Sequence, residues 1–199
     1  MPDAIQDLSK VLRAKLRKIA EEFANGEINT EQFHTLYERY QTQLNLLSIA
    51  NDPAQLKAMS GQEETVHIRT RLMGKALSLA VYHHATGRLI DKIGDFTLSL
   101  PDLMPILNPL LGALRAGKPV EPRVQPVEGG YALFVAGKFS TTIMVFNHEP
   151  NIQQVAAIAA MHGDFEVANA AALGRERPEE VKLASPFISF VMKTLQKKG

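Results

Sequence analysis

The first fifty residues repeat apolar side chains at intervals of three and four, which is the period of an amphipathic helix. The first repeat, in residues 4–24, ends at Asn25 and Gly26, which favour a helix C-terminus, and the second begins after a cap at Asn29 or Thr30. The pattern predicts an antiparallel helical hairpin over residues 1–50. The two apolar stripes consist of Leu8, Leu12, Leu16, Ile19 and Phe23, and of Phe33, Leu36, Tyr37, Tyr40, Leu44 and Leu47.

The period is lost in residues 51–64, where Pro53 and other turn-forming residues predict a linker. In residues 65–72, Val66 and Ile68 alternate with charged residues, and this alternation favours a strand with one polar face. A short helix is the alternative for the same stretch. The domain boundary is therefore expected within the linker.

Two β-hairpins are predicted further along the chain. Residues 76–84 and 88–93 flank a short turn that places Gly87 in the left-handed conformation. Residues 131–136 and 140–147 flank a second turn, in which Gly137 is expected to supply the positive φ of a type II′ hairpin. The strands of the second hairpin are apolar on both faces, so they need cover on both faces.

Three further stretches fit helices or an edge strand. Ser99 is expected to cap residues 100–116, which the two prolines Pro105 and Pro109 divide into a kinked helix or two short helices. Prolines also confine residues 120–127 to a sheet edge or a bulge. A long helix over residues 152–173 is expected to cover one face of the second hairpin through Val155, Ile158, Ala159, His162 and Phe165.

A last amphipathic helix is expected after Ser185-Pro186. Docking of this helix on its own domain is favoured over a partner-binding or membrane-surface role. The elements together predict an α+β fold, a mixed antiparallel sheet flanked by helices and preceded by a helical hairpin. The expected divisions are a hairpin at 1–50, a linker at 51–64, an α+β domain at 65–183 and a C-terminal helix at 184–199.

Composition narrows the function classes. The chain has 199 residues, a formal net charge of +1, 45% hydrophobic residues and no cysteine. The near-neutral charge gives no electrostatic support for a nucleic-acid partner, and the lack of cysteine removes disulfides and thiolate chemistry. No apolar run approaches the roughly 20 residues of a membrane span, and the polar start does not resemble a signal peptide. A soluble cytoplasmic protein is expected.

The six histidines and the acidic residues are the candidates for catalysis and metal binding. His83 and His84 are adjacent on a predicted strand, so they point to opposite faces, and no histidine pair has the spacing of a zinc site. The segment beginning at Gly137 departs from a phosphate-binding loop, since Phe139 follows Lys138. No Gly-x-Ser-x-Gly sequence is present. We therefore expect no catalytic residues, no metal site and no cofactor.

The order strand, tight turn, strand, helix, strand, hairpin and long helix resembles the Roadblock (dynein light-chain) family, which has a profilin-like layout. The residues that carry the resemblance are the hairpin from Leu79 to Ile90, the strand pair 131–135 and 141–146, and the helix 152–173. They cover about half of the chain. The residues around Asn25-Gly26 also resemble short helical-hairpin modules, which implies an oligomerisation or tethering role.

The resemblance implies a non-catalytic homodimer that binds or regulates a small Ras-like GTPase, or that scaffolds a complex. Family dimers form through the middle helix and the strand after it, which correspond to residues 100–116 and 120–127. A PAS-like sensor of a small molecule and an enzyme of unrecognised type remain the alternatives. The candidate interaction residues, on the middle helix and the last helix, are Leu103, Leu107, Leu110, Leu111, Leu114, Phe187, Phe190, Val191 and Leu195.

Overall fold

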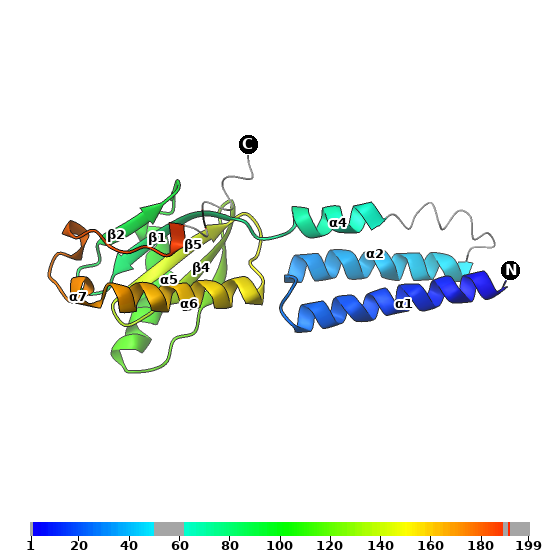
Figure 1. Cartoon of the computed structure of the whole chain (residues 1–199), viewed down its shortest axis with the longest axis horizontal. Coiled ribbons are helices and arrows are strands. Elements are labelled where there is room, and N and C mark those ends of the chain that lie inside the picture. The colour runs from blue at the N-terminus through cyan, green and yellow to red at the C-terminus, as the bar shows by residue number, and fades with distance from the viewer. Residues whose placement is uncertain (1, 50–61, 189–190, 192–199) are drawn as a thin grey trace. The chain divides into compact units, whose positions relative to one another are not determined.

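The structure is a computed structural model and describes residues 2–49, 62–188 and 191. The chain forms two compact units, which are coloured along the chain in Figure 1. The first unit comprises Met1–Met73 with Asn151–Gln153, and the second comprises Gly74–Pro150 with Gln154–Gly199. Each unit has its own apolar core and is described by itself.

The first unit contains the helical hairpin expected from the sequence. Helix α1 (Pro2–Ala24) and helix α2 (Thr30–Ile49) pack against each other, and Gly26 between them has a φ of 70°. A positive φ is accessible to glycine without the steric penalty of a Cβ atom, so Gly26 ends the first helix. The core of this unit contains Leu12, Ile19, Ile28, Leu36, Tyr40 and Leu47.

A reciprocal pair of side chains caps α2. The Asn29 side-chain oxygen accepts the Gln32 backbone N–H at 2.8 Å, and the Gln32 side-chain oxygen accepts the Asn29 N–H at 2.9 Å. This is a capping box. The amide nitrogens of the same two side chains donate to the carbonyls of Leu72 and Arg69, at 2.8 and 2.6 Å. The cap therefore also satisfies carbonyls at the C-terminal end of a third helix.

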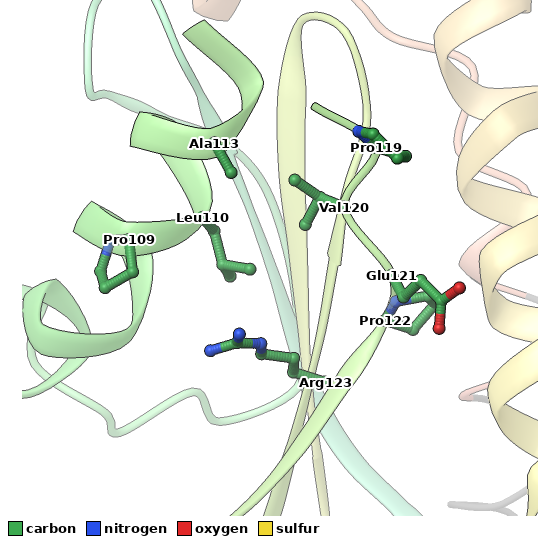
Figure 2. Close-up of a pocket in the computed structure, with 8 residues that line it drawn as sticks. All are labelled: Pro109, Leu110, Ala113, Pro119, Val120, Glu121, Pro122 and Arg123. Atoms are coloured by element: carbon green, nitrogen blue, oxygen red, sulfur yellow. The ribbon is translucent and has the colours of Figure 1, made fainter. Parts of the chain in front are cut away.

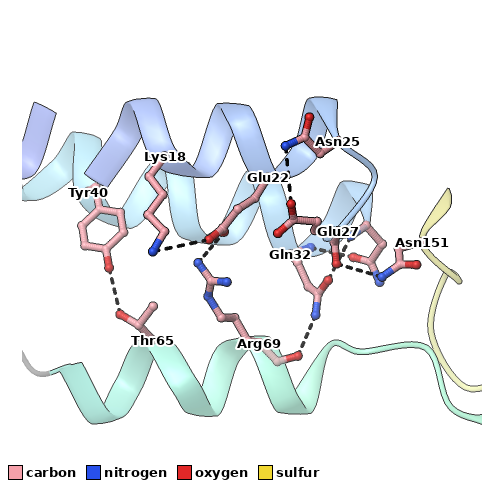
Figure 3. A network of polar contacts seen from close by, with 10 residues as sticks. Lys18, Glu22, Asn25, Glu27, Gln32, Tyr40, Thr65, Arg69 and Asn151 are labelled. Atoms are coloured by element: carbon pink, nitrogen blue, oxygen red, sulfur yellow. Dashed lines mark hydrogen bonds and ion pairs between the residues drawn. The ribbon is translucent and has the colours of Figure 1, made fainter. Parts of the chain in front are cut away.

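That third helix corrects the strand predicted for residues 65–72, because α4 (Gln62–Arg71) is helical there. Thr65, Ile68, Arg69 and Leu72 lie at helical spacing and face α1 and α2. Ile68 packs against the hairpin core, and the side chains of Thr65 and Arg69 bond Tyr40 and Glu22 (Figure 3). The alternation suggested that Val66 and Ile68 share one buried strand face, but only Ile68 packs in the core, and Val66 is 63% exposed.

The domain boundary also differs from the one predicted. The two units meet in sequence at Met73 and Gly74, so residues 65–72 belong to the first unit and not to the α+β domain. The expected linker at 51–64 lies largely outside the described residues, and α4 begins at its end. The reason is that α4 completes the cover of an apolar surface that two helices leave partly open.

The second unit contains a five-stranded antiparallel sheet. Its strands are β1 (Ala76–His83), β2 (Leu89–Ile93), β3 (Arg123–Val127), β4 (Gly130–Ala136) and β5 (Ser140–Phe146). Their spatial order is β2-β1-β5-β4-β3, so β2 and β3 form the two edges. The two predicted hairpins are confirmed, and Gly87 in the first turn has the expected positive φ of 66°.

Helices cover the two faces of the sheet. Helix α6 (Ile152–Ala168), the short helix α7 (Ala170–Leu173) and the C-terminal segment pack on one face, and α5 (Leu100–Arg115) packs on the other. Leu133 and Val135 of β4 point into the first core, whereas Ala132 and Phe134 point into the second. The prediction that this strand needs cover on both faces is confirmed. A 3-10 turn (Pro178–Glu180) follows α7.

The turn between β4 and β5 has a different basis from the one predicted. Gly137 does not have a positive φ. A Cβ atom at this position would lie 2.5 Å from a carboxylate oxygen of Glu166, so any larger residue would have to displace that side chain. Glu166 accepts hydrogen bonds from the backbone N–H groups of Lys138, Phe139 and Ser140. The turn is therefore stabilised by the Glu166 carboxylate of α6 and not by the positive φ expected at Gly137.

Candidate functional site

Helix α5 and strand β3 form the part of the second unit on which the predicted function depends. Ser99 caps α5 as expected, with its hydroxyl oxygen accepting the Asp102 backbone N–H at 3.4 Å. Pro105 and Pro109 lie within a single helix, so the alternative of two short helices is excluded. Proline has no N–H, so each proline leaves one helix carbonyl without its usual partner. Because both prolines are exposed, those carbonyls lie on the solvent side, where water can bond to them.

The predicted interaction residues of α5 are mostly in the core, which corrects their assignment. Leu103, Leu107 and Leu110 are at most 4% exposed and pack against the sheet. Leu111 and Leu114 are half-buried. The sequence showed that these leucines share a helix face, but that face is the one that covers the sheet.

The predicted residues of the last helix need a similar correction. Phe187 and Val191 are fully buried in the core on the α6 side, and the ring of Phe187 lies 5.7 Å from that of Phe165. Phe190 and Leu195 lie outside the described residues. Docking of this segment on its own domain, the favoured interpretation, agrees with the burial of Phe187 and Val191.

The C-terminal segment is held by Asn169, at the junction of α6 and α7. Its side-chain amide donates to the carbonyl of Ala184 and accepts the N–H of Ala184, both at 2.8 Å. A further bond, 2.7 Å long, joins the hydroxyl of Ser185 to a carboxylate oxygen of Asp91. These contacts fix the chain just before Phe187, so that side chain is not available to a partner.

A groove of about 430 Å³ lies between α5 and the segment leading into β3 (Figure 2). Its apolar wall comes from Pro109, Leu110 and Ala113 on the helix and from Pro119, Val120 and Pro122 opposite them. Arg123 extends toward α5 in Figure 2, whereas the carboxylate of Glu121 points away from the helix. Neither Arg123 nor Glu121 forms an ion pair within the part of the chain that the structure describes.

Strand β3 is the free edge of the sheet beside this groove, which confirms the edge position predicted from its prolines. Pro126 lies opposite Tyr131 in the ladder and has no N–H, so the ladder bonds there come from the neighbouring residues Gln125 and Val127. Backbone groups alternate in direction along a strand. The outward-facing positions are therefore Pro122, Val124 and Pro126, of which only Val124 has an N–H to donate.

His162, which is buried, and Glu166, which is half-buried, form a polar cluster that bears on the enzyme alternative. The Nδ1 atom of His162 lies 2.8 Å from the Thr142 hydroxyl, and its Nε2 atom lies 3.6 Å from a Glu166 oxygen. Burial lowers the pKa of His162, although the Glu166 carboxylate acts in the opposite direction. A neutral, buried imidazole beside a carboxylate already engaged by the turn has no access to a substrate.

A second histidine, His84, follows β1 on the other side of the sheet. Its Nε2 atom lies 2.8 Å from the Thr141 hydroxyl, and burial lowers its pKa. His83 points to the opposite face and contacts Thr86 and the Leu173 carbonyl, as expected for adjacent strand residues. Across residues 2–49, 62–188 and 191, no group of three or more His, Asp or Glu side chains is placed to hold a metal ion.

Comparison with protein-family models, with curated proteins and with solved structures gave no match to this chain. Within the described residues, no helix combines the length and the apolarity that crossing a bilayer requires. The site must therefore be interpreted from its own geometry. Sequence reasoning found α5 and β3, but it missed the unpaired Arg123 and Glu121, since their lack of partners is visible only in three dimensions.

Proposed function

We propose that this chain is a non-catalytic regulatory or scaffold protein of the Roadblock type, which forms a homodimer and binds a small Ras-like GTPase. One observation carries the proposal: β3, the strand that follows α5, is the free edge of the sheet beside an apolar groove. By the resemblance, α5 and β3 correspond to the elements through which family dimers form. Here both elements present surface that no other described part of the second unit covers.

The order of the elements supports the same proposal. The second unit runs β1, β2, α5, β3, β4, β5, α6, which is the order on which the resemblance rests. Its sheet is covered by α6 on one face and α5 on the other. A layout of this kind is compatible with many functions, so the support for a partner comes from the edge and the groove and not from the fold.

The edge of β3 suits a second copy of the same strand. In antiparallel pairing about a two-fold axis at Val124, the N–H and C=O groups of the two Val124 residues face each other and exchange two hydrogen bonds. On either side of Val124, Pro122 of one copy would lie opposite Pro126 of the other, and these pairs add no hydrogen bond because proline has no N–H. The prolines thus limit the main-chain contribution, and burial of the groove beside α5 must supply most of the interface.

The charges at the edge also favour a self-complementary interface. Glu121 and Arg123 have opposite signs, lie two residues apart and have no ion-pair partner among the described residues. A two-fold interface presents the same patch on both subunits, so a patch with one acid and one base can pair with itself. A surface of a single sign would instead repel a second copy.

The oligomeric state tests the dimer. Size-exclusion chromatography with light scattering should give twice the 21.9 kDa mass of one chain, and Arg123→Glu should shift the protein toward the monomer. The double variant Glu121→Arg/Arg123→Glu restores opposite charges and should recover the dimer. A wild-type monomer at about 100 μM, well above a micromolar Kd, would overturn the dimer.

The GTPase is tested separately. The tagged chain is incubated with host lysate in excess GTP analogue or in excess GDP, and bound proteins are identified by mass spectrometry. Enrichment of one small Ras-like GTPase in one nucleotide state is expected. Binding of other proteins without regard to nucleotide would leave a scaffold and remove the GTPase from the proposal.

A further inference from the structure

A second cavity lies on the other flank of α5, away from the groove beside β3. It has a volume of about 220 Å³ and lies between α5 and the ends of β1 and β5. Leu100, Met104, Leu107 and Leu111 of α5 form its apolar wall, at the spacing of one helix face. We call this cavity the α5–β1 pocket.

Three polar side chains line the pocket without a partner. Tyr82 comes from β1, and Asn108 and Arg115 come from α5. None of the three forms a hydrogen bond or ion pair with any other described residue. Tyr82 is half-buried and Asn108 and Arg115 are exposed, so water satisfies them in the free protein and their donors are available to a ligand in the cavity.

The electrostatics of the pocket favour an anion. No aspartate or glutamate lines it, and Arg115 supplies its one permanent charge. Burial lowers the pKa of His84, so the imidazole is neutral at pH 7, and burial raises the pKa of Tyr82, so the phenol keeps its proton and can donate. A single guanidinium with a neighbouring hydroxyl donor matches one carboxylate group.

The size of the pocket limits the rest of the ligand. A cavity of about 150 Å³ is enough for benzene, so 220 Å³ accommodates one ring with a short arm or a chain of about eight carbons. We propose that the α5–β1 pocket binds a small monocarboxylic acid with an apolar body, with its carboxylate on Arg115 and its body against the leucines of α5. This inference does not depend on the proposed GTPase partner, and it corresponds to the small-molecule alternative.

The test is calorimetric titration of the full chain with octanoate and, in parallel, with octan-1-ol, which has the same chain length and no charge. We expect saturable binding of octanoate with one site per chain, and weaker binding of octanol. Arg115→Gln should weaken octanoate binding about tenfold or more and leave octanol unaffected. Arg175→Gln removes an exposed arginine of the same unit that does not line the pocket, and it should change neither titration.

A third variant separates the pocket from a general surface effect. Met104→Trp should fill the pocket and abolish binding of octanoate, with the far-ultraviolet circular dichroism spectrum retained. The inference is wrong if octanoate shows no saturation, if Arg115→Gln binds it as the wild type does, or if Met104→Trp binds it unchanged. None of these outcomes bears on the dimer or on GTPase binding, so the two proposals fail independently.

Discussion

At the scale of single residues, the Glu166 side chain holds the turn between β4 and β5. Its carboxylate accepts three backbone N–H groups of the β4–β5 turn and the Ser140 hydroxyl, over distances of 2.7–2.9 Å. Bonds to an ionised group are stronger than neutral ones, and each donor left unpaired would lose stability. One glutamate on α6 therefore joins the helix to the hairpin that precedes it.

The close approach of Glu166 to Gly137 gives a double-mutant test. Gly137→Ala should destabilise the second unit by about 1 kcal/mol or more, since the new Cβ atom displaces a carboxylate held by four bonds. In a Glu166→Ala background the same substitution should be neutral or stabilise by about 0.4–1 kcal/mol, because Gly137 has no positive φ and alanine restricts the unfolded chain.

Urea denaturation of the wild type, both single variants and the double variant measures the coupling. Glu166→Ala alone should cost about 1–3 kcal/mol, the penalty for leaving the part-buried donors of Phe139 and Ser140 unpaired. Additive effects of the two substitutions would contradict a direct contact between Gly137 and Glu166.

His162 predicts how stability depends on pH. Because burial lowers its pKa in the folded state below the ordinary 6.5, the unfolded chain binds the proton more readily. Stability is then fully present above about pH 6.5 and is lost as the pH falls below that value. The titratable groups that face His162 are Glu166 on its own helix and His84 across the sheet. Burial also lowers the pKa of His84.

The measurement is the free energy of unfolding of the second unit between pH 7.5 and 5.5. His162→Gln should reduce the loss of stability across this interval, because glutamine does not titrate. His34→Gln, a change at an exposed position on α2, is the control and should leave the slope as it is. An equal slope in wild type and His162→Gln would show that His162 is not responsible.

At the scale of elements, α5 and β3 show what proline does in regular structure. Pro105 and Pro109 lie on the solvent-facing side of α5, and the three buried leucines on its opposite side pack against the sheet. The helix is therefore retained despite the two prolines. Pro126 remains in a strand because that strand is an edge. In both elements, packing on one side compensates for the hydrogen bonds that proline removes on the other.

The outward donors of β3 determine how strongly it can pair with a second copy. Pro126→Val adds an outward N–H on an exposed position and should strengthen the proposed dimer by allowing two further hydrogen bonds across the two-fold axis. Val124→Pro removes the remaining outward N–H and should weaken it.

Sedimentation equilibrium of each variant gives the dimer Kd. Val124→Ala is the matched control, since it truncates the side chain but keeps the donor, and it separates lost packing from a lost hydrogen bond. Dimer constants that are the same in Pro126→Val, Val124→Pro and wild type would mean that β3 does not form the interface.

At the scale of the whole molecule, the chain consists of two units with separate cores. The three helices of the first unit share the core around Leu36, and the sheet of the second unit has one core on each face. α4 joins the first unit through polar contacts to Glu22, Gln32 and Tyr40 as well as through Ile68. Each core is built from side chains of its own unit.

Separation of the units follows as a prediction. A fragment of residues 1–73 should show a helical circular dichroism spectrum with a cooperative melt, and a fragment of residues 74–199 should show a mixed α and β spectrum. Truncating the first fragment at residue 61 removes α4 and should lower its melting temperature by several degrees, since the carbonyl contacts of Asn29 and Gln32 are lost. A melt of fragment 1–73 unchanged by this truncation would contradict the three-helix unit.

The sequence predicted most elements because their patterns are local. Helical periods found α1, α2 and α6, and the β-rich runs beside Gly87 and Gly137 found both hairpins. It failed at residues 65–72, where alternation of Val66 and Ile68 favoured a strand. The contacts that make this stretch a helix lie on Glu22 and Tyr40, which are more than twenty residues away in the chain.

By itself, then, the sequence determined the α+β class and the helical hairpin, because both follow from side-chain periodicity, and the missing N–H of proline limited residues 120–127 to a sheet edge or a bulge. Tertiary structure decided which leucines of α5 are buried, why position 137 is glycine, and where Tyr82, Asn108 and Arg115 converge. These features depend on distances between segments far apart in the chain. Periodicity gives the face of an element, but only packing decides what that face meets.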